Sequence, residues 1–111
     1  MFQTIADIKD ANAKVDGVWF SAGTMRWFRS RVSSRIYPLP DGGALFISSE
    51  QVNSTPRKYT IRRARPGGTI DTVGAFQAHR TLARAHHHAR QFCTHLHYAA
   101  ARAARTCGTV T

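Results

Sequence analysis

The chain has 111 residues, a formal net charge of +10 and a hydrophobic content of 42%. This length fits one domain with a modest core, and no apolar run approaches the ~18 residues that a membrane span requires. The amphipathic start, MFQTIADIKD, carries two acids and is typical of neither a secretory signal nor a transit peptide. We therefore expect a cytoplasmic protein that does not contact a membrane.

Two short helices are expected before any strand. Thr4 is a good N-cap and Asp7 follows at the third helical position, a variant of the capping box. Apolar residues at helical spacing then predict a helix over about 5–15. Ser21 is the next N-cap and predicts a second helix over about 22–29.

The middle of the chain has the alternation of apolar and polar residues that is typical of strands. It predicts strands over 32–37, 44–49, 57–65 and 69–76. The turn sequences DGG and PGG separate the first two and the last two strands. The polar segment 50–56 is predicted to be a loop. Short connections of this kind favour an antiparallel sheet.

One long helix is predicted from residue 80 or 81 onward. Its apolar residues recur at alternating spacings of three and four, at Leu82, Ala85, Ala89, Phe92, Leu96, Ala99 and Ala103. The part up to about residue 92 is long enough to cover a four-stranded sheet. The rest, 93–111, is a basic extension rich in Ala, Arg and His, and three outcomes are open for it: a partner helix, a homodimer or a frayed tail.

The predicted fold is therefore α+β: two short N-terminal helices, a four-stranded antiparallel sheet, and one long C-terminal helix packed on the sheet. A single domain is expected over 1–92, followed by the extension 93–111. The predicted core consists of Ile5, Ile8, Phe20, Met25, Phe28, Leu45, Ile47, Tyr59, Ile61, Ile70, Val73, Phe76, Leu82, Ala85, Ala89 and Phe92.

Arginine makes up most of the sixteen basic residues, and its guanidinium group binds phosphate and carboxylate with two parallel hydrogen bonds. A charge this high favours a polyanion or an acidic protein surface as partner. A basic surface with no particular partner is the alternative. Two groups are the candidate partner- or phosphate-binding residues: Arg26, Arg29, Arg31 and Arg35, and then Arg57, Lys58, Arg62, Arg63 and Arg65.

No catalytic or metal-binding pattern stands out. Six histidines follow residue 78, and Cys93 with His97 form a pair one helical turn apart. A zinc site needs at least three protein ligands, and no second such pair is present in the sequence. No activated nucleophile, carboxylate pair or phosphate-binding glycine loop is recognisable. We therefore expect neither an enzyme nor a cofactor, and we expect both cysteines, Cys93 and Cys107, to be free thiols.

Three segments, TIADIKDANAKVDGVWFSAGTMRWFRSRV, PRKYTIRRA and GTIDTVGAFQA, resemble a family of short uncharacterised proteins encoded by bacteriophages, prophages and integrative elements. The resemblance covers about residues 3–92. It implies a mobile genetic element as the origin and a bacterial host cell as the location, and it implies no catalytic residues. Family members usually end soon after the covering helix, whereas this chain continues with CTHLHYAAARAARTCGTVT.

Two functions follow as expectations. Small proteins of mobile elements often act stoichiometrically, so the first is a non-catalytic binding protein that occludes a host protein or ribonucleoprotein complex, most plausibly an inhibitor of bacterial defence of the anti-CRISPR type. The second is a small basic accessory protein that binds DNA or RNA directly, with a steep salt dependence.

Overall fold

The computed structural model of the chain describes residues 1–15, 19–27 and 29–110. The predicted fold class is confirmed, because the described chain is α+β with a four-stranded antiparallel sheet and a C-terminal helix. The elements in order are α1 (Ile5–Val15), α2 (Ala22–Trp27), β1 (Arg31–Pro38), β2 (Ala44–Glu50), β3 (Lys58–Ala64), β4 (Ile70–Val73) and α3 (Leu82–Val110).

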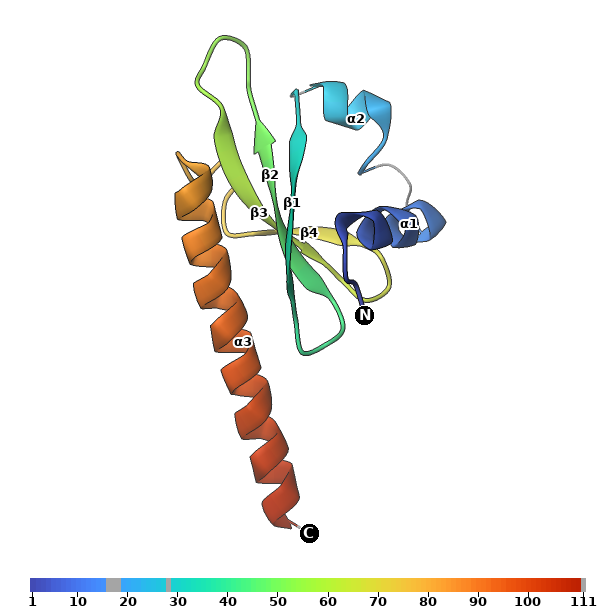
Figure 1. Ribbon diagram of the computed structural model, residues 1–111, viewed down its shortest axis with the longest axis vertical. Coiled ribbons are helices and arrows are strands. Elements are labelled where there is room, and N and C mark those ends of the chain that lie inside the picture. The colour runs from blue at the N-terminus through green and yellow to red at the C-terminus, as the bar shows by residue number, and fades with distance from the viewer. Residues whose placement is uncertain (16–18, 28, 111) are drawn as a thin grey trace.

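The sheet is a meander in which each strand pairs with the next, in the order β1-β2-β3-β4. All three pairings are antiparallel, and the β2–β3 register runs without interruption from Ala44 opposite Ala64 to Glu50 opposite Lys58. The β1–β2 register shifts between Val32 and Ile36. Figure 1 shows α3 along one side of the sheet, and α1 and α2 on the other side.

Strand β2 is the centre of the fold, because all seven of its residues are buried. Its alternate side chains enter two different cores. Leu45 and Ile47 belong to the cluster that α3 covers, whereas Phe46 belongs to the cluster that α1 covers. These three side chains are therefore divided between the two faces of the sheet, and the domain has three layers.

Helix α3 packs closely on the sheet because its contact residues are small. Ala85 and Ala89 have no exposed surface, so the helix backbone approaches the strands without leaving a gap. Phe92, Cys93 and Leu96 continue the contact at its edge, where they are partly buried. A larger side chain at either alanine would overpack this contact, at a cost of about 1–3 kcal/mol.

The opposite core is built around aromatic rings. Trp19 packs edge-on against Phe46 with ring centroids 5.5 Å apart, and Phe20 stacks on Phe46 at 5.9 Å. Ile8 of α1 is fully buried in the same cluster. Aromatic pairs at these distances contribute about 0.5–1.5 kcal/mol beyond the burial of their area, so this core anchors Trp19 and Phe20, shortly before α2.

The predicted helix caps are confirmed. The Asp7 carboxylate accepts hydrogen bonds from the backbone N–H groups of Gln3 (2.9 Å) and Thr4 (3.0 Å), and Thr4 Oγ1 accepts one from the Asp7 N–H (3.3 Å). These hydrogen bonds lower the pKa of Asp7. Ser21 caps α2 by accepting from the Thr24 N–H at 3.2 Å.

Several expectations were wrong in detail. Glu50 is not in a loop: it is the last residue of β2 and is 1% exposed. Strand β4 ends at Val73 because Gly74 has φ +76° and turns the chain. As a result Phe76 is 44% exposed rather than in the core, and Leu82, at the start of α3, is 40% exposed. The predicted core residue Phe28 lies outside the described residues.

The second half of α3 extends beyond the sheet (Figure 1). Nε2 of His97 lies 2.8 Å from the carbonyl oxygen of Pro38, close to the last point of contact. Side chains from Tyr98 to Arg105 are exposed except for Ala100. The helix itself continues to Val110, so it projects as a rod into solvent. A partner helix or a homodimer through this rod stays a prediction.

The β3–β4 turn offers a sharp test of the packing against α1. A Cβ on Gly68 would meet the Ala11 carbonyl oxygen at 2.4 Å, and the residue has φ +107°, whereas a Cβ on Gly67 would meet nothing within 4 Å. We expect Gly68→Ala to lower the free energy of unfolding by about 2 kcal/mol or more, and Gly67→Ala to change it by less than about 1 kcal/mol. Urea unfolding followed by circular dichroism measures both, and equal losses would contradict this packing.

Candidate functional site

The most buried charge in the described chain is the Glu50 carboxylate, with its side chain 2% exposed. It accepts hydrogen bonds from Ser48 Oγ (2.6 Å), Thr60 Oγ1 (2.9 Å) and Nη2 of Arg62 (3.1 Å). The Gln77 amide also donates to the Glu50 backbone carbonyl at 2.9 Å. Hydrogen bonds and an opposite charge of this kind offset the cost of burying a carboxylate.

Arg62 is held by the same network. Its Nε donates to Ser48 Oγ at 2.9 Å, and Nη1 donates to the Thr72 hydroxyl. Its guanidinium carbon lies 5.3 Å from the Trp19 ring centroid and 5.6 Å from that of Phe76. An adjoining cavity of about 350 Å³ reaches α2. Glu50 and Arg62 compensate each other's charge, and their network joins β2, β3, β4 and the loop before α3.

Two further arginines of the second predicted group are also paired. Arg63 binds Asp41 at 3.2 Å, and Arg65 binds Asp71 at 2.6 Å. Burial raises the pKa of Asp41, but the Gly43 N–H and the Arg63 guanidinium outweigh it, so this pKa lies below its usual value. The charges at 62, 63 and 65 are thus largely neutralised within the chain.

Arg31 and Arg57 behave differently, and the fold brings them together. Arg31 lies opposite Ser49 in the β1–β2 pairing. Nη1 of Arg57 donates to the backbone oxygen and the hydroxyl of the same Ser49, at 3.1 and 3.0 Å. Both arginines line one cavity of about 220 Å³, together with Val32, Ser33, Ile47, Ser48, Ser49, Tyr59 and Leu82. No carboxylate lines this cavity.

Seven of the basic residues that form no ion pair within the described chain come from elements at one end of the molecule. Figure 1 shows α2, the start of β1, the β2–β3 loop and the start of α3 at its upper end. We call this region the basic end. It comprises Arg26, Arg29, Arg31, Arg57, Lys58, Arg80 and Arg84. Among described residues, none of these seven forms an ion pair with a carboxylate. Arg35, also in the first predicted group, lies farther along β1 with its guanidinium over the Tyr37 ring at 5.3 Å.

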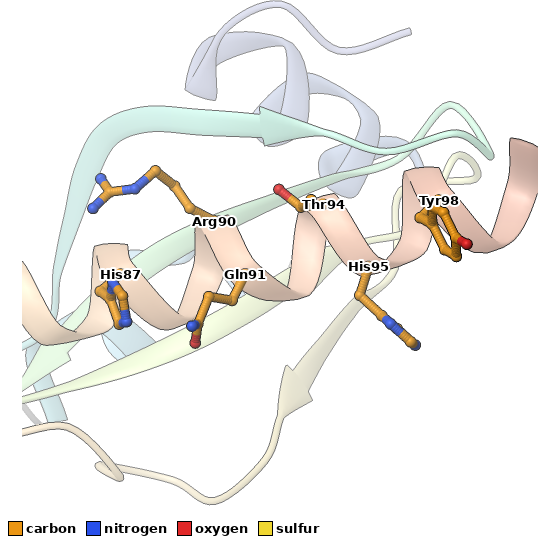
Figure 2. A pocket seen from close by; sticks show the side chains of 6 residues that line it. All are labelled: His87, Arg90, Gln91, Thr94, His95 and Tyr98. Atoms are coloured by element: carbon orange, nitrogen blue, oxygen red, sulfur yellow. The ribbon is translucent and has the colours of Figure 1, made fainter.

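A second exposed surface runs along the outer side of α3. Figure 2 shows His87, Arg90, Gln91, Thr94, His95 and Tyr98, which border an open space of about 530 Å³. All six side chains come from this single helix, so they form a convex surface and cannot enclose a small molecule. The surface carries positive and titratable groups and no acid.

Cys93 and His97, the pair one helical turn apart, contact the backbone of β1. Cys93 Sγ and His97 Nε2 both approach the Pro38 carbonyl oxygen, at 3.4 and 2.8 Å. Among the residues that the structure describes, no group of three or more His, Cys, Asp or Glu could hold a metal ion. In the same part of the chain, no helix is long and apolar enough to cross a membrane.

Two histidines are partly buried between α3 and the sheet. The Tyr37 hydroxyl and Nδ1 of His86 are 2.7 Å apart. Burial lowers the pKa of His86, and Arg35 and Arg90 lower it further. His79 pairs with Tyr59 through two backbone hydrogen bonds, 2.8 and 3.1 Å long, and stacks on His88. Burial lowers its pKa, as do His88 and Arg84.

Sequence reasoning missed Glu50 and Gln77. The place of Glu50 in a strand was not recognised, because its surrounding sequence SSEQVNST has the composition of a loop. The signal that could have found it was the continued alternation of Phe46, Ser48 and Glu50 on one face of β2, opposite the basic β3. Gln77 has φ +58°, and nothing local predicts that its N–H reaches Thr60 Oγ1 at 2.8 Å.

The fold and these surfaces define a small α+β domain with one strongly basic end. A family model matches residues 4–90, which spans the domain from the cap of α1 to the first third of α3. The chain therefore belongs to DUF7447, a family of unknown function. No curated protein and no solved structure is significantly similar to it.

The Glu50–Arg62 pair makes a first prediction for this region. We expect Glu50→Gln to lower the free energy of unfolding by about 3 kcal/mol or more, because it leaves the Arg62 charge buried without its partner. The matched control is Asp71→Asn in the exposed Arg65–Asp71 pair, which should cost less than about 1 kcal/mol. Urea unfolding measures both variants. A Glu50→Gln protein as stable as the control would show that the network contributes little.

Stability should also depend on pH through the histidines. The ordinary pKa of 6.5 is lowered for both His79 and His86 in the folded chain, so the unfolded chain takes up these protons first as the pH falls. We therefore expect the melting temperature to drop as the pH is lowered through 6.5, between about pH 7.5 and about pH 5. The Asp7 and Asp41 carboxylates, with lowered pKa values, titrate well below that window. His86→Gln should flatten the dependence, and an unchanged slope in this variant would contradict the assignment.

Proposed function

We propose that this protein is a non-catalytic binding protein of a mobile genetic element that occupies a host nucleic-acid-handling complex, as an inhibitor of bacterial defence of the anti-CRISPR type does. The resemblance to proteins of phages and integrative elements supports the origin. The basic end supports the kind of partner, since unneutralised arginines favour a polyanion or an acidic protein surface.

The observation that carries this proposal is the uneven neutralisation of the charge. Arg62, Arg63 and Arg65 have carboxylate partners within the chain. The basic end does not, although it gathers residues from α2, β1, the β2–β3 loop and the start of α3. A surface that holds like charges together raises the energy of the isolated molecule, and an anionic partner relieves this repulsion.

The contacts proposed from the sequence are refined accordingly. Arg26, Arg29, Arg31, Arg57 and Lys58 are the proposed contact residues, with Arg80 and Arg84 added by the fold. Arg35 is retained at the edge of this surface. Arg62, Arg63 and Arg65 would contribute mainly by holding the sheet in shape, because a partner would have to compete with Glu50, Asp41 and Asp71 for them.

Capture from host lysate, with and without nuclease, tests the proposal. We expect the wild-type chain to retain a protein complex after nuclease treatment, and Arg26→Gln/Arg84→Gln to bind it more weakly by about a hundredfold or more, since each of the two lost charge-assisted contacts costs about 1.5–3 kcal/mol. The matched control is Lys9→Gln/Lys14→Gln, which removes the same charge from α1. Equal losses in the two double variants would place the contact elsewhere.

Direct binding of DNA or RNA is the second candidate, and the same basic end supports it. In that case the captured material disappears with nuclease, and binding to naked nucleic acid falls steeply with salt. This result would replace the inhibitor proposal.

A further inference from the structure

The cavity between Arg31 and Arg57 has the chemistry of a phosphate site. Its volume of about 220 Å³ is sufficient for one phosphate group and part of the sugar attached to it. Arg31 enters from β1, and Arg57 enters from the segment just before β3. The two arginines are 26 positions apart in the sequence, and they meet only because Ser49 lies between them in the sheet.

Hydrogen bonds hold the Arg57 side chain in place and leave other donors of its guanidinium group unused. Both of its hydrogen bonds to Ser49 leave from Nη1. Within the described chain no hydrogen bond leaves from Nε or Nη2, the edge that binds two oxygens of a phosphate in parallel. The side chain is thus fixed before any ligand binds, so little conformational entropy is lost on binding.

Arg31 supplies a second, adaptable charge. It is exposed and makes no ion pair with a described carboxylate. The Ser49 hydroxyl accepts from Arg57 and still carries a hydrogen to donate. Ser33 is also among the lining residues, while Ile47, Tyr59 and Leu82 supply apolar surface. Ser48 borders the cavity too, but its hydroxyl is bound to Glu50 and Arg62 on the other face of the sheet.

The β1 strand is shaped to leave this space. Val32 pairs with Ser48 and Ile36 pairs with Phe46, so three residues of β1 lie opposite Ile47 alone. A bulge of this kind turns a strand away from its neighbour. The nearest acid along β2, Glu50, is engaged by Arg62 on the opposite face of the sheet, so its charge is neutralised.

We propose that this cavity binds one phosphate group of a nucleic-acid strand, with the attached sugar against Tyr59 and Leu82. The inference deepens the proposed function and rests on it for the identity of the partner. It also places a specific phosphate-binding site within the basic end.

Inorganic phosphate is the first probe, titrated into the full chain at constant ionic strength and followed by NMR of backbone amides and arginine Nε–H groups. Constant ionic strength removes the general effect of screening. The expected shifts centre on Arg31, Ser49 and Arg57. Shifts spread evenly over the basic end would overturn the site.

Three variants sharpen the test. Arg31→Gln should weaken phosphate binding by about tenfold or more, because a charge-assisted hydrogen bond is lost; this residue is exposed, so the fold is retained. Arg57→Lys keeps the positive charge but loses the guanidinium edge that donates two parallel hydrogen bonds, and it should also weaken phosphate binding by about tenfold. Lys14→Gln removes one exposed charge from α1, outside the basic end, and should leave phosphate binding unchanged. An equal loss of phosphate binding in Lys14→Gln would contradict the proposal.

Short oligonucleotides identify the source of the phosphate. If a 5′-phosphorylated strand competes with inorganic phosphate and the same strand without that phosphate does not, the cavity binds a terminal phosphate. Equal competition by both assigns a backbone phosphate. If neither competes while inorganic phosphate binds, the nucleic-acid part of the inference is wrong and the site is one for free phosphate.

The two proposals can fail separately. Retention of a nuclease-resistant complex by a chain that does not bind phosphate overturns this inference and leaves the proposed function standing. Phosphate binding by a chain that captures no complex overturns the proposed function and leaves this inference standing.

Discussion

The burial of one carboxylate organises much of this domain. Glu50 lies at the end of the central strand, where the helices on both sides of the sheet exclude water from β2. Its charge is compensated by Ser48, Thr60 and Arg62, and its backbone carbonyl by Gln77. The loop that leaves β4 therefore has to turn at Gly74 and return across β3. This return leads into the Tyr59–His79 backbone pairing and fixes where α3 begins.

The arginines of the chain are of two kinds, which differ in whether a carboxylate within the described chain pairs with them. Those on β3 complete the internal network or pair with nearby acids, and they hold the sheet in shape. Those at the basic end have no carboxylate partner within the described chain. Net charge alone does not reveal this division, because a paired arginine and an unpaired one contribute equally to the +10 total. The distribution of the charge, rather than its size, distinguishes the basic end from the rest of the surface.

Helix α3 combines two roles along its length. Its first part covers the sheet through Ala85 and Ala89, and its last contact with the sheet is near His97 and Pro38. Beyond that point the helix carries mostly alanine, with Tyr98, Arg102 and Arg105. The family model ends at residue 90, within the part that covers the sheet. The projecting rod therefore lies outside the matched region, and it gains nothing from the sheet that stabilises the rest.

The sequence by itself determined the local structure. The caps at Thr4 and Ser21, the alternation in the strands and the spacing of apolar residues in α3 depend on neighbours within a few positions, so they could be read from the chain. The absence of acids after Asp71 was equally visible. Only the tertiary structure decided that Glu50 is buried, that Phe76 and Leu82 are exposed, and that Arg31 and Arg57 share a cavity. These outcomes depend on which strands pair and in which register, and contacts between residues far apart in the chain leave no periodic signal in it.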